Sequence, residues 1–495
     1  MSRFFYAETE SRAYANYSPN PSPKLQVGYD YGVFLATSKS KAGPTLEPVY
    51  WEPDKLTNHH IGILGNSGSG KTHFIRQFMS AMPEDVTLEI LDYHGDINTN
   101  MSGTKTLMFS QNTRYGYNPL VVNTNVHYGG VRRACNDVID AINATSHKLG
   151  GRQVNVLRNL MLDAYVSRGI YEDRPETWHK KIGTTEELDL LRANNDEEAL
   201  FDYYPTLRDV LEIARRRLRA LYLSIDDREE GMATLDYYDE FTKAQASFGR
   251  LKKEISRVER LEQAADETLN RLAEKRDELM DKCVTKFRDF LSSMESGKDL
   301  DDAINYSNKD ILQSVCSRLE ELINIGLFEP NPPPWGDARV RRYYLKPLAQ
   351  SSSELIMFVR FRLQAIIREM MQEGESNGKL RRLIVLDESK VFNNNEMDNP
   401  INIIATQMRK FGLGLMMASQ SPVHLSDDFV KNAGTLILLN LSTTDWDDTA
   451  RSLKIPRDVL QHLVPQQIAA IRMIEAGGQQ RFKGIYMKGG RRRSA

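Results

Sequence analysis

Short runs of apolar residues, each followed by a segment with helical spacing, recur toward both ends of the chain. Such runs, bounded by polar or turn residues, are typical of strands that are buried on both faces. They occupy Ile61–Leu64, Val86–Asp92, Leu383–Leu386, Gly414–Gln420 and Leu436–Leu441. Because strands and helices alternate, we predict an α/β fold in which helices cover both faces of a mostly parallel sheet.

The middle of the chain has helical spacing instead. Helices are expected over 131–169, with a break at Leu149–Gly151, and over the basic stretch Leu207–Leu223. The segment 170–206 is acidic and is predicted to be irregular.

A long stretch within this region has no helix-breaking residue. Between Gly249 and Gly297 there is neither proline nor glycine, and apolar residues recur at spacings of four and three. This pattern favours one or two long helices. It leaves open whether they form a projecting hairpin or pack on the rest of the protein.

The remaining segments indicate how the chain divides. Residues 1–26 are rich in proline and serine and are predicted to be an irregular arm, whereas Tyr31–Ala36 and Pro48–Trp51 are predicted strands. Asn331–Gly336 has three consecutive prolines and predicts a rigid linker. We therefore expect an N-terminal arm at 1–50, an α/β core made of 51–130 and 331–495, and an all-helical, coiled-coil-like insertion at 131–330.

Composition excludes several classes of protein. With 65 Lys and Arg against 67 Asp and Glu, the net charge is −2, so any nucleic acid would be bound by local patches. The three cysteines (Cys135, Cys283 and Cys316) are far apart, which argues against a zinc site or a disulfide framework and favours the cytoplasm. No apolar run is long enough for a transmembrane helix, so no membrane is expected.

The strongest chemical motif follows the first apolar run. It fits G-x-x-x-x-G-K-[ST], the phosphate-binding loop of nucleotide triphosphatases, with every fixed position matched: Gly65, Asn66, Ser67, Gly68, Ser69, Gly70, Lys71 and Thr72. Glycines let the backbone N–H groups turn into one concavity. Lys71 is expected to reach the β- and γ-phosphates of ATP, and the Thr72 hydroxyl to hold Mg²⁺.

A second motif ends the strand Leu383–Leu386. Asp387 and Glu388 follow it directly, as in a Walker B element. Asp387 would then belong to the Mg²⁺ shell and Glu388 would orient the attacking water. Together with the phosphate loop, these carboxylates predict ATP hydrolysis.

Two further residues are candidates for catalysis. Gln420 ends the strand Gly414–Gln420, where an amide suits a sensor of the γ-phosphate. Arg409 precedes that strand, and in a ring it could reach the γ-phosphate of a neighbouring subunit as an arginine finger.

These blocks carry a family resemblance. Leu91–Asp96 (Leu-Asp-Tyr-His-Gly-Asp) resembles the D-P-H-G-E/D signature of HerA-type ATPases, and Tyr117–Leu120 resembles the N-P-L that follows it. Arg409–Leu415 with Ala418–Pro422 looks like the R-K-[FY]-G-[VL]-G-L…[ST]-Q-x-P block of the same family. The blocks occur in the family's order and extend over 45–480, so the chain resembles the HerA/FtsK superfamily.

The resemblance implies a RecA-like P-loop ATPase that forms a ring, usually a hexamer, and moves double-stranded DNA through a central pore. It implies that ATP and Mg²⁺ are the cofactors and that a helical insertion lies near 207–300. Two features depart from the family pattern. The complete N-terminal β-barrel of HerA proteins is expected to be reduced or absent here, and Ser389-Lys390 follow the two carboxylates where the family has Ala-His.

Three functions remain open at the level of the sequence. The first is a DNA translocase or helicase that works with a nuclease or another effector, such as a NAD-hydrolysing protein, in DNA processing or antiphage defence. The second is a conjugative or type IV secretion-type ATPase, and the third is a nucleotide-gated oligomeric scaffold that activates a defence effector. Four basic clusters are candidates for the DNA path: Arg215, Arg216, Arg217 and Arg219; Arg339, Arg341 and Arg342; Arg381 and Arg382; and Arg491, Arg492 and Arg493.

Overall fold

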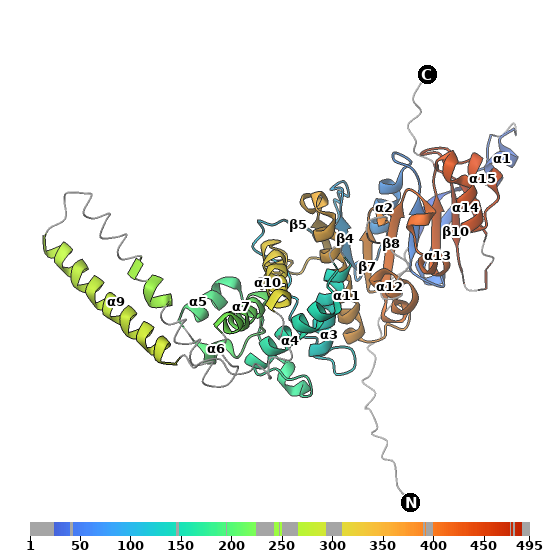
Figure 1. The fold of residues 1–495 in the computed structure, drawn as a ribbon. Coiled ribbons are helices and arrows are strands. Elements are labelled where there is room, and N and C mark those ends of the chain that lie inside the picture. Colours follow the sequence, from blue (N-terminus) through green and yellow to red (C-terminus); the bar gives the residue numbers. More distant parts are fainter. Residues whose placement is uncertain are drawn as a thin grey trace, which may run out of the picture. The chain divides into compact units, whose positions relative to one another are not determined.

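The predicted sheet is present in the computed structural model (Figure 1). Among the residues that the structure describes, it has eleven strands. The structure describes residues 24–39, 43–144, 148–194, 196–223, 242–246, 248–249, 266–293, 309–389, 392, 399–475, 477–478 and 481–487. These residues form two compact units. Unit 1 comprises the chain up to Met108, Trp335–Leu355 and the chain from Arg362 onward, and unit 2 comprises Phe109–Pro334 with Ile356–Phe361.

The central strands of unit 1 are parallel. Their order is β9-β3-β8-β7-β4-β6-β5, and every neighbouring pair in this set is parallel. The strands are β3 (Ile61–Leu64), β4 (Thr87–Asp92), β5 (Thr104–Met108), β6 (Val340–Tyr344), β7 (Arg382–Leu386), β8 (Leu413–Ser419) and β9 (Thr435–Leu438). The predicted strands at 61–64, 86–92, 383–386, 414–420 and 436–441 are therefore confirmed, each to within a few residues.

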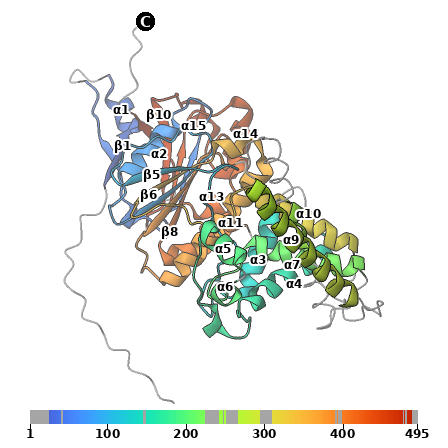
Figure 2. The same ribbon diagram turned by 90° about the vertical axis from the view of Figure 1, so that its left-hand side faces the viewer.

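Both faces of this sheet are buried at β3, β7 and β8. On one face Ile63, Val385 and Met416 share a core with Phe74 and Phe78 of α2 (Lys71–Ser80), which lies against the sheet (Figure 2). The alternate residues of the same strands point to the other face and are also fully buried; they include Leu64, Ile384, Leu386, Leu415 and Met417. The predicted α/β fold with helices on both faces is thus confirmed.

The antiparallel edge of the sheet comes from the two ends of the chain. Beyond β9 the order continues β10-β11-β1-β2, all antiparallel. These strands are β10 (Ile468–Met473), β11 (Lys483–Tyr486), β1 (Leu25–Asp30) and β2 (Pro48–Trp51). The strand predicted at 48–51 is confirmed, and β1 begins within the segment predicted to be irregular.

The strand predicted at Tyr31–Ala36 is wrong, because α1 (Tyr31–Thr37) is helical. Asp30 caps this helix, and its carboxylate accepts a hydrogen bond of 3.1 Å from the Val33 amide. The remaining helices of unit 1 are α11 (Ser352–Glu373), which also contributes 356–361 to unit 2, and α12 (Pro400–Gln407), α13 (Asp427–Asn432), α14 (Trp446–Leu453) and α15 (Arg457–Gln461).

Unit 2 is helical throughout its core. It contains α3 (Val131–Asn143), α4 (Gly151–Ser167), α5 (Thr185–Ala193), α6 (Glu197–Leu200), α7 (Leu207–Leu223), α9 (Asp266–Ser293) and α10 (Lys309–Asn324). The break predicted near 149–151 and the bounds predicted for the basic helix are confirmed. The irregular segment predicted at 170–206 is wrong in part, because Thr184 and Glu187 form a capping box that starts α5.

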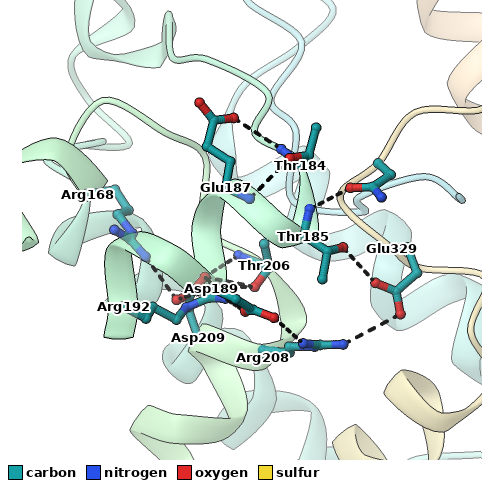
Figure 3. A network of polar contacts seen from close by, with 11 residues as sticks. Arg168, Thr184, Thr185, Glu187, Asp189, Arg192, Thr206, Arg208, Asp209 and Glu329 are labelled. Atoms are coloured by element: carbon teal, nitrogen blue, oxygen red, sulfur yellow. Dashed lines mark hydrogen bonds and ion pairs between the residues drawn. The ribbon is translucent and has the colours of Figure 1, made fainter. Parts of the chain in front are cut away.

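A buried ion-pair network connects the helices of unit 2 (Figure 3). The carboxylate of Asp209 on α7 accepts hydrogen bonds from Arg168 (2.9 Å) and Arg192 (3.0 Å). It also accepts bonds from the backbone and hydroxyl of Thr206. The two guanidinium groups and Thr206 thus satisfy the carboxylate of Asp209, whose side chain is only 9% exposed.

Helix α9 is the described part of the long proline-free stretch. Side chains of this helix are solvent-accessible wherever the structure describes them, including Met280, Val284 and Phe287 on one face. The first half of the predicted four-three pattern, at 251–265, lies outside the described residues. The choice between a hairpin and packed helices therefore stays a prediction.

Candidate functional site

The phosphate loop connects β3 to α2. Its conformation needs glycine, because φ is +75° at Gly68 and +110° at Gly70. Gly65 is needed for a different reason, since a Cβ there would lie 2.5 Å from the Ser69 hydroxyl oxygen. The first helical residue is Lys71, so the open N–H groups of α2 face the loop.

Lys71 lies across this loop. Its ammonium group donates hydrogen bonds to the carbonyl oxygens of Gly65 (2.7 Å) and Asn66 (3.0 Å). Burial lowers the pKa of Lys71, while the carboxylates of Asp387 and Glu388 act in the opposite direction. The loop lysine and the two carboxylates predicted from separate motifs therefore belong to one electrostatic site.

The acidic side of the site lies at the carboxyl ends of β4 and β7. One carboxylate oxygen each of Asp92, Asp96 and Asp387 lie within 4.8 Å of one another. Burial raises the pKa of Asp387 to about 6, and the negative charge of Asp96 acts in the same direction. Asp92 and Asp387 are buried and Asp96 is exposed. A cluster of carboxylates that offers only oxygen ligands fits Mg²⁺, with Thr72 and Asp387 as the predicted protein ligands.

Asp92 has a structural partner within this cluster. The guanidinium of Arg342 on β6 donates to one Asp92 oxygen at 2.5 and 2.8 Å, and the other oxygen accepts the Gly95 amide at 2.8 Å. Arg342 also bonds the Gly95 carbonyl and the Asn98 side chain. Asp92 and Arg342 thus hold the loop that carries His94 and Asp96.

Glu388 follows β7 in an unusual backbone conformation. Its φ is +66°, a value that a glutamate rarely adopts and that is enriched at functional sites. Its Oε2 atom accepts a hydrogen bond of 3.4 Å from the amide of Gln420 and lies 3.8 Å from the Nε2 atom of His94. The structure therefore brings the predicted sensor Gln420 to the predicted water-orienting carboxylate.

Arg409 lies elsewhere. It is exposed and belongs to a 3₁₀ turn, Met408–Phe411, that precedes the amino end of β8, whereas Gln420 follows the carboxyl end of the same seven-residue strand. A strand of this length spans about 20 Å. Within one chain, Arg409 therefore lies at the amino ends of the parallel strands, whereas the phosphate loop lies at their carboxyl ends.

Two of the candidate basic clusters are occupied by structural contacts. Arg339 donates to the carbonyl oxygens of Val86 and Met82, and Arg341 pairs with the buried Glu89. Arg381 donates to the carbonyl oxygens of Gly374 and Glu375, and Arg382 pairs with Glu369. In the cluster on α7, Arg215 pairs with Glu320 and Arg217 pairs with Asp163. The fourth cluster, Arg491, Arg492 and Arg493, lies outside the described residues.

The chain matches a known protein family over most of its length. The family model described as "Helicase HerA, central domain" matches residues 35–334, which is more than half of the chain. The chain belongs to this HerA family. The predicted superfamily is thereby confirmed, and so is the predicted enzyme class, since the chain is a P-loop ATPase of the HerA type whose loop and acidic cluster fit ATP and Mg²⁺.

A solved structure of another protein, VirB4, agrees with the fold of this chain. VirB4 of Thermoanaerobacter pseudethanolicus is 13% identical, with a TM-score of 0.55 over 96% of this HerA-family chain and 98% of the other. The bacterial conjugative coupling protein TrwBΔN70 is 11% identical, with a TM-score of 0.46 over 96% and 97% of the two chains. No curated protein matches the sequence. Among the helices that the structure describes, none is both long and apolar enough to cross a membrane.

Several site residues of this HerA-family chain were not assigned a chemical role from the sequence. Asp92, His94 and Asp96 appeared there only as letters of the family signature, and their meeting with Asp387 and Glu388 depends on the pairing of β4 with β7. Arg342 was predicted only as a candidate for the DNA path, and nothing in the sequence indicated its contact with Asp92, which is 250 residues away. The order of the parallel strands, which the sequence did not predict, is what brings these residues together.

Proposed function

We propose that this HerA-family chain is an ATP-hydrolysing motor that assembles into a ring, most simply a hexamer, and translocates double-stranded DNA. The observation that carries the proposal is the convergence of Lys71, Glu388 and Gln420 at one site in a chain that the HerA helicase domain matches over 300 residues, 35–334. In the proposed reaction ATP supplies the energy, and the residues of the chain hold it and orient the water.

Each residue then has a distinct task. The N–H groups of the loop Gly65–Thr72 and the ammonium of Lys71 bind phosphate oxygens. Thr72 and Asp387 hold Mg²⁺, and Glu388 orients the water that attacks the γ-phosphate. The contact of Gln420 with Glu388 gives the sensor a direct route to the carboxylate, so that the presence of the γ-phosphate changes the position of the water-orienting group.

The position of Arg409 supports a ring. Arg409 is exposed at the amino ends of the parallel strands, whereas the phosphate loop lies at their carboxyl ends. An arginine finger at this position would therefore have to act on the nucleotide of a neighbouring subunit. A closed ring of identical subunits places the same edge of each chain against the next one.

The motor is proposed to work together with an effector protein. We propose that the helical unit 2 recruits a nuclease or another effector, such as a NAD-hydrolysing protein, and α9 is the candidate element because its described side chains are accessible. Two other functions compete with the motor: an ATPase for conjugation or secretion, and a nucleotide-gated scaffold that activates a defence effector. Neither of these requires that duplex DNA accelerate hydrolysis.

The experiment compares ATP hydrolysis by the full chain with and without duplex DNA at low and high salt. The motor predicts that duplex DNA binds at low salt, accelerates hydrolysis and loses affinity steeply as salt rises, because phosphate contacts release counterions. Glu388→Gln should bind duplex DNA without hydrolysis. A folded protein that hydrolyses ATP but neither binds duplex DNA nor responds to it would contradict the motor and favour the scaffold.

A further inference from the structure

A cavity of about 540 Å³ lies beside the phosphate loop, within unit 1. Ser69 and Gly70 of the loop and the first turns of α2 form one side of it. The other side comes from β1 and from the residues Gln466 and Met487, near the ends of the chain. Its volume is in the range of small-molecule sites. Apart from Ser69 and Gly70 of the phosphate loop, the residues that line it have no role in the reaction described above.

Strand β1, which forms the wall opposite α2, has an irregularity where it lines the cavity. The pairing of β1 with β2 shifts register between Gln26 and Gly28, as at a β-bulge, and both residues line the cavity. Gly28 is needed because a Cβ there would lie 2.9 Å from the Tyr486 carbonyl oxygen of β11. Bulges of this kind redirect side chains and are frequent beside binding sites.

Gln466 connects the cavity to the phosphate loop. Its amide nitrogen donates a hydrogen bond of 3.2 Å to the carbonyl oxygen of Gly68. Its φ is +59°, a conformation that costs a glutamine free energy and is retained where the surrounding structure holds it. The side chain thus lies over the glycines of the loop, at the boundary between the phosphates and the cavity.

The polar lining of the cavity includes Tyr29, Ser69 and His73, and its side-chain amides suit adenine. Side-chain amides are contributed by Gln26, Gln77 and Gln466, and no arginine or lysine is among the described residues that line it. An amide offers a donor and an acceptor side by side, which complements the N6 and N7 edge of adenine. Guanine presents two acceptors at that edge and is matched by arginine or lysine instead.

We propose that this cavity binds the adenosine part of the nucleotide and that Gln466 is a residue that selects adenine over guanine. The inference rests on the ATP site of the proposed function and adds the chemistry of base selection to it. It also makes the two ends of the chain part of the nucleotide site, because β1 and Met487 form a wall that the base would contact.

The test measures the binding of ATPγS, GTPγS and inorganic tripolyphosphate to the full chain by calorimetry. The main variant is Gln466→Gly, which removes the amide and suits the positive φ, so the fold is retained. The matched control is Gln467→Ala, an exposed glutamine next in the chain whose side chain does not line the cavity.

We expect the wild type and Gln467→Ala to bind ATPγS about tenfold or more tightly than GTPγS. Gln466→Gly should lose most of that preference while its affinity for tripolyphosphate is unchanged. Amide hydrogen exchange gives a second readout, in which ATPγS should protect β1 and tripolyphosphate should not. Equal binding of ATPγS and GTPγS by the wild type, or an unchanged preference in Gln466→Gly, would overturn the base pocket. A wild type that binds tripolyphosphate but shows no base effect would leave the motor intact, whereas one that binds no phosphate would contradict the ATP site itself.

Discussion

The side-chain amide of Gln420 donates a hydrogen bond of 3.4 Å to Glu388, although the two residues follow different strands. The contact exists because β7 and β8 are parallel neighbours whose carboxyl ends meet at one edge of the sheet. Glu388 has a left-handed backbone conformation there, with φ of +66°. A carboxylate on a strained backbone, with a neutral amide as its neighbour, is suited to orient a water molecule.

Replacing this carboxylate should separate binding from hydrolysis. Glu388→Gln keeps the shape and the contact with Gln420 but removes the charge that orients water. We expect a loss of 10²–10⁴-fold in kcat, the usual range for a general base, with little change in the affinity for ATPγS. Steady-state kinetics and calorimetry measure the two quantities. Glu375→Gln, at an exposed glutamate that pairs with Lys410, should behave as the wild type.

The sensor should couple to the same carboxylate. Gln420→Ala removes the amide, so we expect a fall in kcat of roughly tenfold or more with a nearly unchanged KM. In the double variant Gln420→Ala with Glu388→Gln, the two effects should not add, because both act on one water. Multiplicative losses in kcat would show that Gln420 acts independently of Glu388.

Arg409 is predicted to act between subunits. Arg409→Ala alone should lose hydrolysis but bind ATPγS normally, since the residue lies at the edge opposite its own phosphate loop. Mixing it with Lys71→Ala, which has an intact Arg409 and a defective loop, should restore part of the activity in mixed rings. Lys410→Ala is the matched control, as the neighbouring exposed cation. Normal hydrolysis by Arg409→Ala would remove the proposed arginine finger.

The buried carboxylate of unit 2 predicts a dependence of stability on pH. Although burial opposes it, the charges of Arg192 and Arg168 lower the pKa of Asp209 below its usual value of 3.8. The stabilisation is therefore fully present from about pH 5 upward, and it is lost as the pH falls through the lowered pKa. Amide exchange of α4 and α7 from pH 6 down to pH 2.5 should show this loss.

Asp209→Asn tests the same network at neutral pH. It leaves two arginines without their buried counter-charge, so unit 2 should lose about 3–5 kcal/mol of stability at pH 7. The acid-dependent part of the loss should be absent in this variant. Asp202→Asn, which removes an exposed partner of Lys181, should change stability by less than about 1 kcal/mol. Equal effects of the two substitutions would contradict the assigned network.

The sequence predicts those parts of the site that consist of one continuous stretch of residues. Gly65–Thr72 and the strand before Asp387 are local patterns, because one loop and one apolar run determine them. The antiparallel edge could not be predicted, since β1 pairs with β11 across more than 400 residues of chain. Nothing local indicates such a partner.

Local chemistry also explains where the structure differs from the sequence-based expectations. Tyr31–Ala36 has the apolar content of a strand, but the cap by Asp30 starts a helix. The arginines at 339–342 and at 381–382 were predicted as candidates for DNA contacts because they cluster in the sequence. In the fold they alternate between strand faces or lie at strand ends and bind carbonyl oxygens and buried carboxylates. Whether a basic residue is available to DNA depends on partners that only the fold brings to it.

Displacement of a third strand from duplex DNA tests the motor most directly. A labelled third strand is annealed to one end of a long duplex, and its release is followed after addition of ATP. The account predicts ATP-dependent release by the wild type, with none by Lys71→Ala or Glu388→Gln and none with ATPγS. A wild-type protein that hydrolyses ATP in the presence of the duplex but leaves the third strand in place would contradict translocation.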